Sequence, residues 1–524
     1  MSIDLSLERI RRLVSHLPPY TRPTCHIAGT NGKGSVSALL SSIFSASSYS
    51  VGRFNSPHLV SVHDCIALNG EPVSSSVYAA ARRRVEEADK EHATGCSSFE
   101  LLTLTALQVF EQAGVDIVVL EVGMGGRLDA TNVVPDEYVL VSALTAVDLD
   151  HQAFLGSTVR EIAREKAAIA RPHKPFVLGP QNPSHSEVVE QVVRETIERV
   201  EGKLFPVVPP TKRDWAATLD GRDHYPRTLT ASAFPADGPP PFAQPVTFAL
   251  PGLKDSDVVN VLLPLQGEHQ QGNLGTAITI ISALLQCPSY KLDFPLRITA
   301  ATVSQGIQST RWPGRLSFHT VTPPRPVSSA PGQPLLVLAD GAHNAASAAT
   351  LAAFLDEVLE GVTRLPDNNY SDAPAPHSRH RTLTLTYLLA LSHSPPKTPA
   401  QTLAPLFVHA RAVRDPHVRL VTRVGLLGFS PPQGMPWVKP VPSAQVREAA
   451  RGLLPDVEIW TADDRAAGGE EQLGSALAWA AERQRADAEA GDAGEGEGVV
   501  VIAGSLYLVA DFYRMLQRQE VTEA

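Results

Sequence analysis

The sequence is poor in cysteine and contains no long apolar run. Its four cysteines lie far apart and include no C-x-x-C pair, so neither a zinc knuckle nor a disulfide framework is indicated, and a reducing compartment is expected. No stretch approaches the roughly 18 apolar residues of a membrane-spanning helix. The first ten residues include Asp4 and Glu8, whereas a transit peptide avoids acidic residues. We therefore expect a cytoplasmic protein with no membrane partner.

Positive charge is also scarce. The chain has 45 Lys and Arg against 55 Asp and Glu, which gives a formal net charge of -10 and a pI near 5.9. A protein that binds the nucleic-acid backbone normally carries a basic face, so this balance argues against nucleic acid as a partner. Small anionic substrates must then be held by local sites.

The length indicates more than one domain. A chain of 524 residues and 56.1 kDa is too long for a single compact core, so we expect two domains. Its 43 prolines exceed average usage and indicate loop insertions, the largest of them near residues 206–245 around short strands. Further loops are expected near residues 321–334, 365–378, 393–400 and 485–498.

Buried strands alternate with helices in two blocks of the chain. In the first block, residues 24–27 form a strand that leads through a glycine loop into a helix, and residues 116–120 form a continuous apolar strand that suits a parallel sheet covered on both faces. In the second block, strands at 335–339 and 499–503 flank a helical pattern at 345–359. This order predicts an α/β fold.

The loop Gly29-Thr-Asn-Gly-Lys-Gly-Ser35 has the composition of a phosphate-binding loop. Between a strand and a helix it would offer backbone N–H groups, a helix N-terminus and the Lys33 ammonium to an anion. Its spacing departs from G-x-x-x-x-G-K-[ST], because only two residues separate the first glycines and Gly34 precedes Ser35. A bare glycine turn is the alternative.

Three further residues are ambiguous when each is taken alone. Glu121 ends a buried strand before a glycine-rich turn and could serve Mg²⁺ or be a solvated strand-end carboxylate. His151 could be a ligand or a structural histidine. A Thr158–Glu161 capping box opens a helix that we expect to run to about Ala170. Lys166 lies on the apolar stripe of this helix, and a lysine in such a position usually extends its ammonium to the surface.

Six motifs together resemble one known family, and they appear in the family's order over nearly the whole chain. The chain resembles the folylpolyglutamate synthase and dihydrofolate synthase family of the Mur-ligase type in the runs His26-Ile-Ala-Gly-Thr-Asn-Gly-Lys-Gly-Ser35, Ser56-Pro-His-Leu59, Glu121-Val-Gly-Met-Gly-Gly-Arg-Leu-Asp-Ala-Thr-Asn132, Glu161-Ile-Ala-Arg-Glu-Lys166, Trp312-Pro-Gly-Arg315 and Asp340-Gly-Ala-His-Asn344. Asn55 and Ala168 depart from residues common in the family, and neither change removes a reactive group.

The resemblance implies a P-loop ATPase domain of the Mur-ligase central type at residues 1–308, with the insertion near 206–245. A Rossmann-like glutamate-ligase domain would follow at 309–524, with the reaction in the cleft between the two. The implied ATP contacts are Thr30, Asn31, Gly32, Lys33, Gly34, Ser35, Asn273, Arg315 and Asp340. Magnesium, as one ion or two and with K⁺ as a further candidate cation, would be held by Ser56, Glu121, His151 and Lys166. Lys166 would be carbamylated, which turns a cation into an anionic metal ligand.

The resemblance also implies a site for dihydropteroate. An aromatic ring such as Phe99 can stack on a flat pterin, although a core phenylalanine that opens the next helix is the alternative. The implied pteroate contacts are Ser2, Ile3, Asp4, Leu5, Ser97, Ser98, Phe99, Glu100, Leu128, Asp129 and Ala130, and the weaker candidates for the glutamate site are His343 and Ser505. The implied catalytic residues are Lys33, Lys166, Asp340 and His343.

Three segments favour addition of the first glutamate. Asn31 in the loop, the run at 434–438 and the run at 504–508 are similar to fungal dihydrofolate synthetases. We therefore expect a monomeric ligase acting on dihydropteroate, L-glutamate and ATP. The alternatives are a folylpolyglutamate synthase or a bifunctional enzyme, a non-catalytic scaffold on the same fold, and a peptidoglycan ligase of the Mur type.

Overall fold

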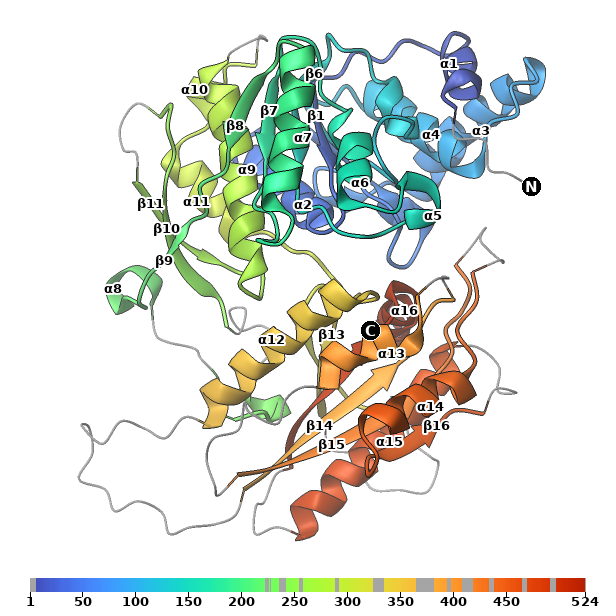
Figure 1. The fold of residues 1–524 in the computed structure, drawn as a ribbon, viewed down its shortest axis with the longest axis vertical. Coiled ribbons are helices and arrows are strands. Elements are labelled where there is room, and N and C mark those ends of the chain that lie inside the picture. The colour runs from blue at the N-terminus through green and yellow to red at the C-terminus, as the bar shows by residue number, and fades with distance from the viewer. Residues whose placement is uncertain are drawn as a thin grey trace. The chain divides into compact units, whose positions relative to one another are not determined.

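The computed structural model describes residues 6–221, 226, 228–234, 242–253, 258–287, 292–323, 334–363, 381–393, 397–407, 418–432, 438–463, 469–490 and 496–523. These residues form two compact units, coloured in chain order in Figure 1. The first unit draws on segments 1–221, 244–264 and 268–312, and the second on segments 222–243, 265–267 and 313–524. The second unit thus takes part of the segment in which an insertion was expected.

The first unit is built on an eight-stranded sheet in which six neighbouring strands run parallel to one another. β1 lies between β5 and β6, while β3 and β4 extend one edge in antiparallel pairing. In spatial order the strands are β4 (Glu71–Pro72), β3 (Ile66–Leu68), β2 (Val51–Phe54), β5 (Ile117–Glu121), β1 (Thr24–Ala28), β6 (Val139–Leu144), β7 (Pro175–Leu178) and β8 (Lys203–Pro206).

Helices cover both faces of this sheet. One face carries α2 (Lys33–Ala46) and α9 (His269–Gln286), and α11 (Ala300–Gln308) packs against α2. The other carries α1 (Glu8–Val14), α3 (Ser75–Glu91), α4 (Ser98–Ala113), α6 (Val159–Ala167) and α7 (Ser186–Arg199). Because adjacent residues of a strand point to opposite faces, the strand register assigns Glu121 to the α2 face and His26 to the α4 face.

Shorter elements complete the first unit. The segment expected as an insertion contributes short strands to a three-stranded antiparallel sheet. These elements are β9 (Thr211–Lys212), β10 (Gln244–Ala249), β11 (Val258–Leu263), α5 (Gln152–Leu155), α8 (Ala217–Asp220), α10 (Phe294–Arg297), η1 (Val62–Cys65) and η2 (Ala130–Val133).

The second unit has a six-stranded sheet in which only β12 is antiparallel. Its order is β12 (Ser317–Val321), β13 (Leu335–Ala339), β17 (Glu497–Ala503), β14 (Arg381–Leu389), β15 (Val418–Leu426) and β16 (Glu458–Thr461). One face packs on α12 (Ala345–Thr363), α13 (Pro399–Leu403), η4 (Ala404–Phe407) and α14 (Ser443–Leu453). The other carries α15 (Gly469–Ala490) and α16 (Leu506–Glu523), and η3 (Ala231–Ala233) adds a short turn.

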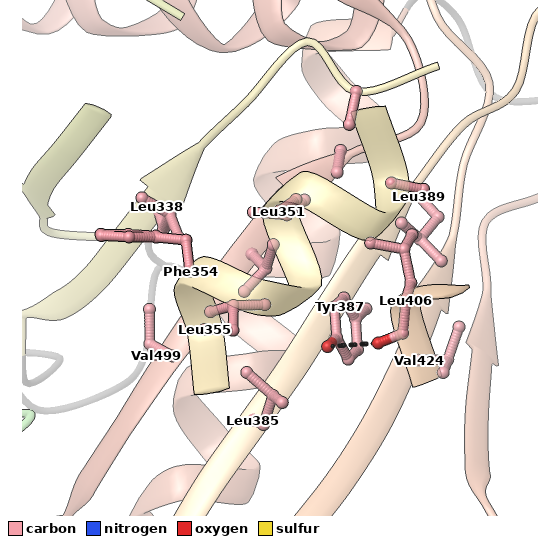
Figure 2. Close-up of a cluster of buried hydrophobic side chains, with 14 of the residues drawn as sticks. Leu338, Leu351, Phe354, Leu355, Leu385, Tyr387, Leu389, Leu406, Val424 and Val499 are labelled. Atoms are coloured by element: carbon pink, nitrogen blue, oxygen red, sulfur yellow. Dashed lines mark hydrogen bonds between the residues drawn. The ribbon is translucent and has the colours of Figure 1, made fainter. Parts of the chain in front are cut away.

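The core of the second unit lies between α12 and the strands beneath it. Figure 2 shows Leu351, Phe354 and Leu355 of α12 packed toward the sheet. Tyr387 of β14 is fully buried, and its hydroxyl donates a hydrogen bond to the carbonyl of Leu406 at 3.0 Å. That bond compensates for the loss of water around the phenol oxygen, so a polar atom is tolerated in an apolar cluster.

The structure confirms the α/β class and the predicted strands. The Thr158–Glu161 capping box is present, but the helix that it opens ends at Ala167, three residues before the predicted end. The loop expected at 485–498 is wrong at its start, because α15 continues to Ala490. Alanine and charged residues at 485–490 favour a helix, and this local propensity outweighed the biased composition. Of the described helices, none has the length and apolar character needed to cross a membrane.

Candidate active site

The phosphate loop follows β1 and opens α2. Gly32 has a left-handed φ of 92° and precedes the first helical residue, Lys33. A Cβ at Gly32 would lie 2.3 Å from Oδ1 of Asn273 on α9, so only glycine fits the approach of the two elements. Asn273 also donates to Oε1 of Gln270 at 2.9 Å, and Gln270 donates to the hydroxyl of Ser35 at 3.2 Å. The predicted residues Asn273, Gly32 and Ser35 therefore meet, although about 240 residues separate them in the chain.

Two lysines converge on the carbonyl of Gly29. Lys33 Nζ donates to the carbonyls of Gly29 and Thr30, both at 3.1 Å, and Lys166 Nζ donates to Gly29 at 2.9 Å. Lys166 is buried, with 3% of its surface exposed. Burial, and after it the Lys33 ammonium, lower the pKa of Lys166 to about 7, against opposing effects of Asp150 and Asp129. A lysine in this place is largely neutral at mildly basic pH.

Glu121 lies at the carboxyl end of β5, beside Lys33 and Asn55. Its Oε1 is 3.8 Å from Lys33 Nζ, and its Oε2 accepts a hydrogen bond from Asn55 Nδ2 at 2.5 Å. Ser56 follows Asn55 directly in the chain, just after the end of β2. Asn55 thus orients the predicted metal-binding carboxylate.

The predicted metal residues fit a cation that is held mainly by a nucleotide. Within the part of the chain that the structure describes, no group of three or more His, Cys, Asp or Glu side chains is arranged to hold a metal alone. Magnesium prefers hard oxygens, usually keeps several waters and often takes only one or two carboxylates from the protein. Glu121 and Ser56 offer such oxygens. His151 has a left-handed φ of 52°, and its half-exposed ring lies 3.9 Å from Oδ2 of Asp150.

Residues 97–100 open α4 with a capping box. Ser97 Oγ accepts from the N–H of Glu100 at 3.3 Å, and Glu100 Oε2 accepts from the N–H of Ser97 at 2.6 Å. Glu100 also forms an ion pair with Arg9 at 3.3 Å. Ser98 is exposed, and the partly buried Phe99 packs against the α4 core cluster and over Gly123, where a Cβ would lie 2.2 Å from the ring. This contact supports the core interpretation of Phe99 and leaves the pterin contact a prediction.

Asp129 organises the loop that follows β5. Its Oδ1 accepts from the N–H of Thr131 at 3.0 Å and from the Thr131 hydroxyl at 2.5 Å, and Oδ2 accepts from the N–H of Met124 at 2.8 Å. Because Thr131 donates its only hydroxyl hydrogen to Asp129, it must accept from Nε2 of the buried His26 at 2.9 Å. Burial raises the pKa of Asp129. The neighbouring Leu128 and Ala130 belong to the surrounding apolar cluster.

Ser2, Ile3, Asp4 and Leu5 lie outside the described residues, as do residues 434–437 of the segment that suggested a fungal enzyme. The pteroate contacts at residues 2–5 stay predictions from the sequence.

In the second unit, Arg315, Asp340 and His343 lie around Gly341. Asp340 is buried and accepts from the N–H groups of Leu316 at 2.9 Å and Ala342 at 2.8 Å. Burial raises the pKa of Asp340, and the Arg315 guanidinium lowers it in part. A Cβ at Gly341 would lie 2.6 Å from Nη1 of Arg315, and the carbonyl of Gly341 accepts from Nδ1 of His343 at 2.8 Å. The structure thus gathers three predicted residues at the end of β13.

Ser505 lies at the end of β17 in the same unit. Its side chain is almost fully buried, its hydroxyl is 3.0 Å from that of Ser392, and it accepts from the N–H of Tyr507 at 3.2 Å. Asp340 and Ser505 follow adjacent parallel strands, β13 and β17, so both lie at the carboxyl edge of the sheet. This edge is where ligands bind in open α/β sheets.

Sequence reasoning missed the residues that support the site. Asn55 was noted only as a departure from the family pattern, and His26 only as part of a motif. Arg53 was not considered, although a charge on a short buried strand is itself a signal, because such positions are normally apolar.

Comparison with known proteins places the chain among folate enzymes. Residues 382–515 match the family model described as Dihydrofolate synthetase, C-terminal domain. The chain is 29% identical over 522 residues to the dihydrofolate synthetase of Saccharomyces cerevisiae, covering 98% of both chains. It is 28% identical over 525 residues to a probable dihydrofolate synthetase of Schizosaccharomyces pombe, covering 99% of both chains.

A solved structure shows the same fold. The Escherichia coli enzyme in complex with DHPP and ADP is 25% identical, with a TM-score of 0.62, and the alignment covers 99% of this chain and 95% of the other. Agreement of this extent, in sequence and in both units, leaves one conclusion. The chain belongs to the folylpolyglutamate synthase and dihydrofolate synthase family of ATP-dependent ligases.

Proposed function

We propose that the protein is a dihydrofolate synthase, which joins L-glutamate to 7,8-dihydropteroate with ATP and releases dihydrofolate, ADP and phosphate. The observation that carries this proposal is the match over nearly the whole chain to two proteins named as dihydrofolate synthetases. A non-catalytic scaffold would not need Lys33, Glu121 and Lys166, and all three are present and adjacent to the loop or to one another. We place the enzyme in the cytoplasm as a monomer.

The nucleotide would be held by both groups of predicted residues. The backbone N–H groups at 30–35 and the N-terminus of α2 suit the phosphates, and the N-terminal part of α9 brings Asn273 beside Gly32 of this loop. Arg315 and Asp340 are further proposed contacts of the nucleotide. Lys33, whose ammonium donates to the carbonyls of Gly29 and Thr30, is the proposed contact of the terminal phosphate.

The metal site would use Ser56, Glu121, His151 and the carbamate of Lys166. The neutral amine of Lys166 adds to carbon dioxide, forms an N–C bond and loses a proton, which leaves an anionic carbamate. A lowered pKa makes the amine available for this step. Bound magnesium would neutralise charge on the phosphoryl oxygens, and K⁺ is a further candidate for the same region.

The first chemical step activates the acid. A carboxylate and an amine do not condense in water, because hydroxide is a poor leaving group. A carboxylate oxygen of dihydropteroate attacks the γ-phosphorus of ATP, the bond to the bridging oxygen breaks, and ADP leaves. Lys33 stabilises the charge that spreads over the phosphoryl oxygens, which is electrostatic catalysis by a fixed cation. The product is an acyl phosphate.

The second step forms the amide. The neutral α-amine of glutamate attacks the acyl carbon, the tetrahedral intermediate collapses, and phosphate leaves while the nitrogen loses a proton. Asp340 and His343, at the carboxyl edge of the second sheet, are the proposed residues that orient the amine and take this proton. Ser505 would contact a glutamate carboxylate. Positioning of three reactants supplies much of the rate.

The test is ADP release by the purified protein with Mg-ATP and L-glutamate, with either dihydropteroate or tetrahydrofolate as the acceptor. Turnover with dihydropteroate alone is expected. Lys33→Ala should lower kcat about 100-fold or more, since a transition-state charge contact is lost. The exposed Lys90→Ala on α3 is the matched control. Turnover only with tetrahydrofolate would identify a polyglutamate synthase, turnover with both would identify a bifunctional enzyme, and turnover with neither would favour a scaffold.

A further inference from the structure

Arg53 is a partly buried arginine whose side chain has no hydrogen-bond acceptor among the described residues. It lies on β2, and its Nε is buried with no acceptor. Among the described residues its side chain forms no hydrogen bond and no ion pair, and the guanidinium carbon lies 5.1 Å from the centre of the Trp312 ring. Enclosure of a guanidinium without acceptors costs free energy, so such a residue needs another reason to be there.

The strand register places Arg53 on the face of the phosphate loop. Arg53 pairs with Val119 on β5, and Glu121 lies two residues beyond Val119. Because side chains two apart on a strand share a face, Arg53 and Glu121 both point to the α2 face. Burial lowers the pKa of Arg53, and Glu121 is the charged group that raises it. The guanidinium is therefore near the carboxylate that flanks Lys33.

Trp312 fixes the other side of the guanidinium. A Cβ at Gly34 would lie 2.3 Å from Cζ2 of Trp312, so the indole edge rests on the loop while its face carries Arg53. This contact also explains why a glycine stands between Lys33 and Ser35. A stacked indole limits the rotation of the guanidinium and leaves its edge free for an oxyanion.

We propose that Arg53, held by Trp312, is a second fixed cation that binds the terminal phosphoryl oxygens of ATP beside Lys33. The ligand class is an oxyanion, first the γ-phosphoryl group and then the same group as the acyl phosphate. Planar N–H pairs match two oxygens of a phosphoryl group, which a single ammonium cannot do. Trp312 acts as a positioning residue. The part of the inference that concerns the acyl phosphate rests on the proposed function, whereas the part that concerns ATP does not.

The test measures Mg-ATP and ADP affinity by titration calorimetry without a pterin, in the wild type, Arg53→Met and Arg53→Lys. Arg53→Met should lower the affinity for Mg-ATP roughly tenfold or more and change the affinity for ADP by no more than about twofold, because ADP lacks the γ-phosphoryl group. Arg53→Lys keeps the positive charge but lacks the paired N–H donors of a guanidinium, so its affinity for Mg-ATP should lie between those of the wild type and Arg53→Met. The exposed Arg84→Gln on α3 is the matched control.

Thermal unfolding of the ligand-free protein separates binding from a structural role. Because the Arg53 side chain forms no hydrogen bond or ion pair among the described residues, Arg53→Met should leave the melting temperature equal or higher. A lower melting temperature with an unchanged ratio of ATP to ADP affinity would overturn the proposal, as would equal weakening of both nucleotides. A rise confined to the KM for dihydropteroate would overturn it as well and assign Arg53 to the acid. If the wild type binds Mg-ATP but does not use dihydropteroate as a substrate, the proposed function is wrong, while the proposal for Arg53 and ATP is unaffected.

Discussion

At the residue scale, the site depends on charged groups with little contact to water. Lys166 is the clearest case, because its ammonium is enclosed and shares the Gly29 carbonyl with Lys33. In that setting burial disfavours the positive charge and favours the neutral amine. The same reasoning explains why an apolar helix stripe holds a lysine.

Lys166 should make activity depend on carbon dioxide. Enzyme prepared in CO₂-free buffer is expected to lose activity and regain it with bicarbonate, because the carbamate re-forms on the neutral amine. Lys166→Arg cannot form it and should lower kcat about 10- to 100-fold, as changes at metal sites commonly do. A carbamate resonance in carbon NMR with labelled bicarbonate is the direct measurement. Full activity without carbon dioxide, and no such resonance, would refute the idea.

At the element scale, α6 is fixed to the loop after β5 by close backbone contact. The N–H of Arg127 donates to the carbonyl of Glu165 at 2.9 Å. A Cβ at Gly126 would lie 2.8 Å from that carbonyl oxygen and 2.9 Å from the carbonyl oxygen of Lys166. Since both atoms belong to backbone, neither can turn aside as a side chain could.

Gly126→Ala should therefore shift the helix that carries Lys166. We expect a loss of about 1–3 kcal/mol in the free energy of unfolding, as for other overpacked sites, together with reduced kcat. Gly452→Ala is the control, because Gly452 lies in α14 with open space around it. Alanine there should stabilise by up to about 1 kcal/mol. Denaturant unfolding would check both, and equal effects would contradict this account.

Local sequence patterns predicted the helices and strands well, but they did not predict the contacts between segments that are distant in the chain. Residues 24–35 and residues 116–121 are each one continuous segment, so neighbouring residues are enough to predict their burial and their turns. The contacts of Asn55 with Glu121 and of Trp312 with Gly34 depend on strand order and on packing between distant segments. Spacing along the chain contains no information of that kind. The family motifs marked Trp312, but not what it touches.

At the scale of the whole molecule, each unit has a core of its own, so one unit can lose stability before the other. His319 belongs to the second unit, where its Nε2 is 2.9 Å from the Tyr513 hydroxyl and its ring lies edge-on to Phe512. Burial lowers the pKa of His319 to about 4 from the ordinary 6.5. The folded unit therefore favours the neutral ring.

Acid should destabilise the second unit in a defined window. The unfolded chain binds a proton at His319 more readily than the folded chain, so the contribution of the neutral ring is full above pH 6.5 and is lost as the pH falls toward about 4. His319→Gln should flatten this part of the profile, while the exposed His173→Gln in the first unit should follow the wild type. Calorimetric scans from pH 7 to pH 4 measure it. Parallel profiles for all three proteins would exclude His319 as the cause.

The distance along the chain between the phosphate loop and the indole beside it has a consequence for synthesis on the ribosome. Gly34 leaves the exit tunnel early, but Asn273 and Trp312, which rest on the loop, are made about 240 and 280 residues later. At translation rates of roughly 5–20 residues per second, the nascent loop stays without these neighbours for tens of seconds. The first half of this unit therefore emerges before these two side chains are made, and the chain must extend past the end of α11 before both of them can contact the loop.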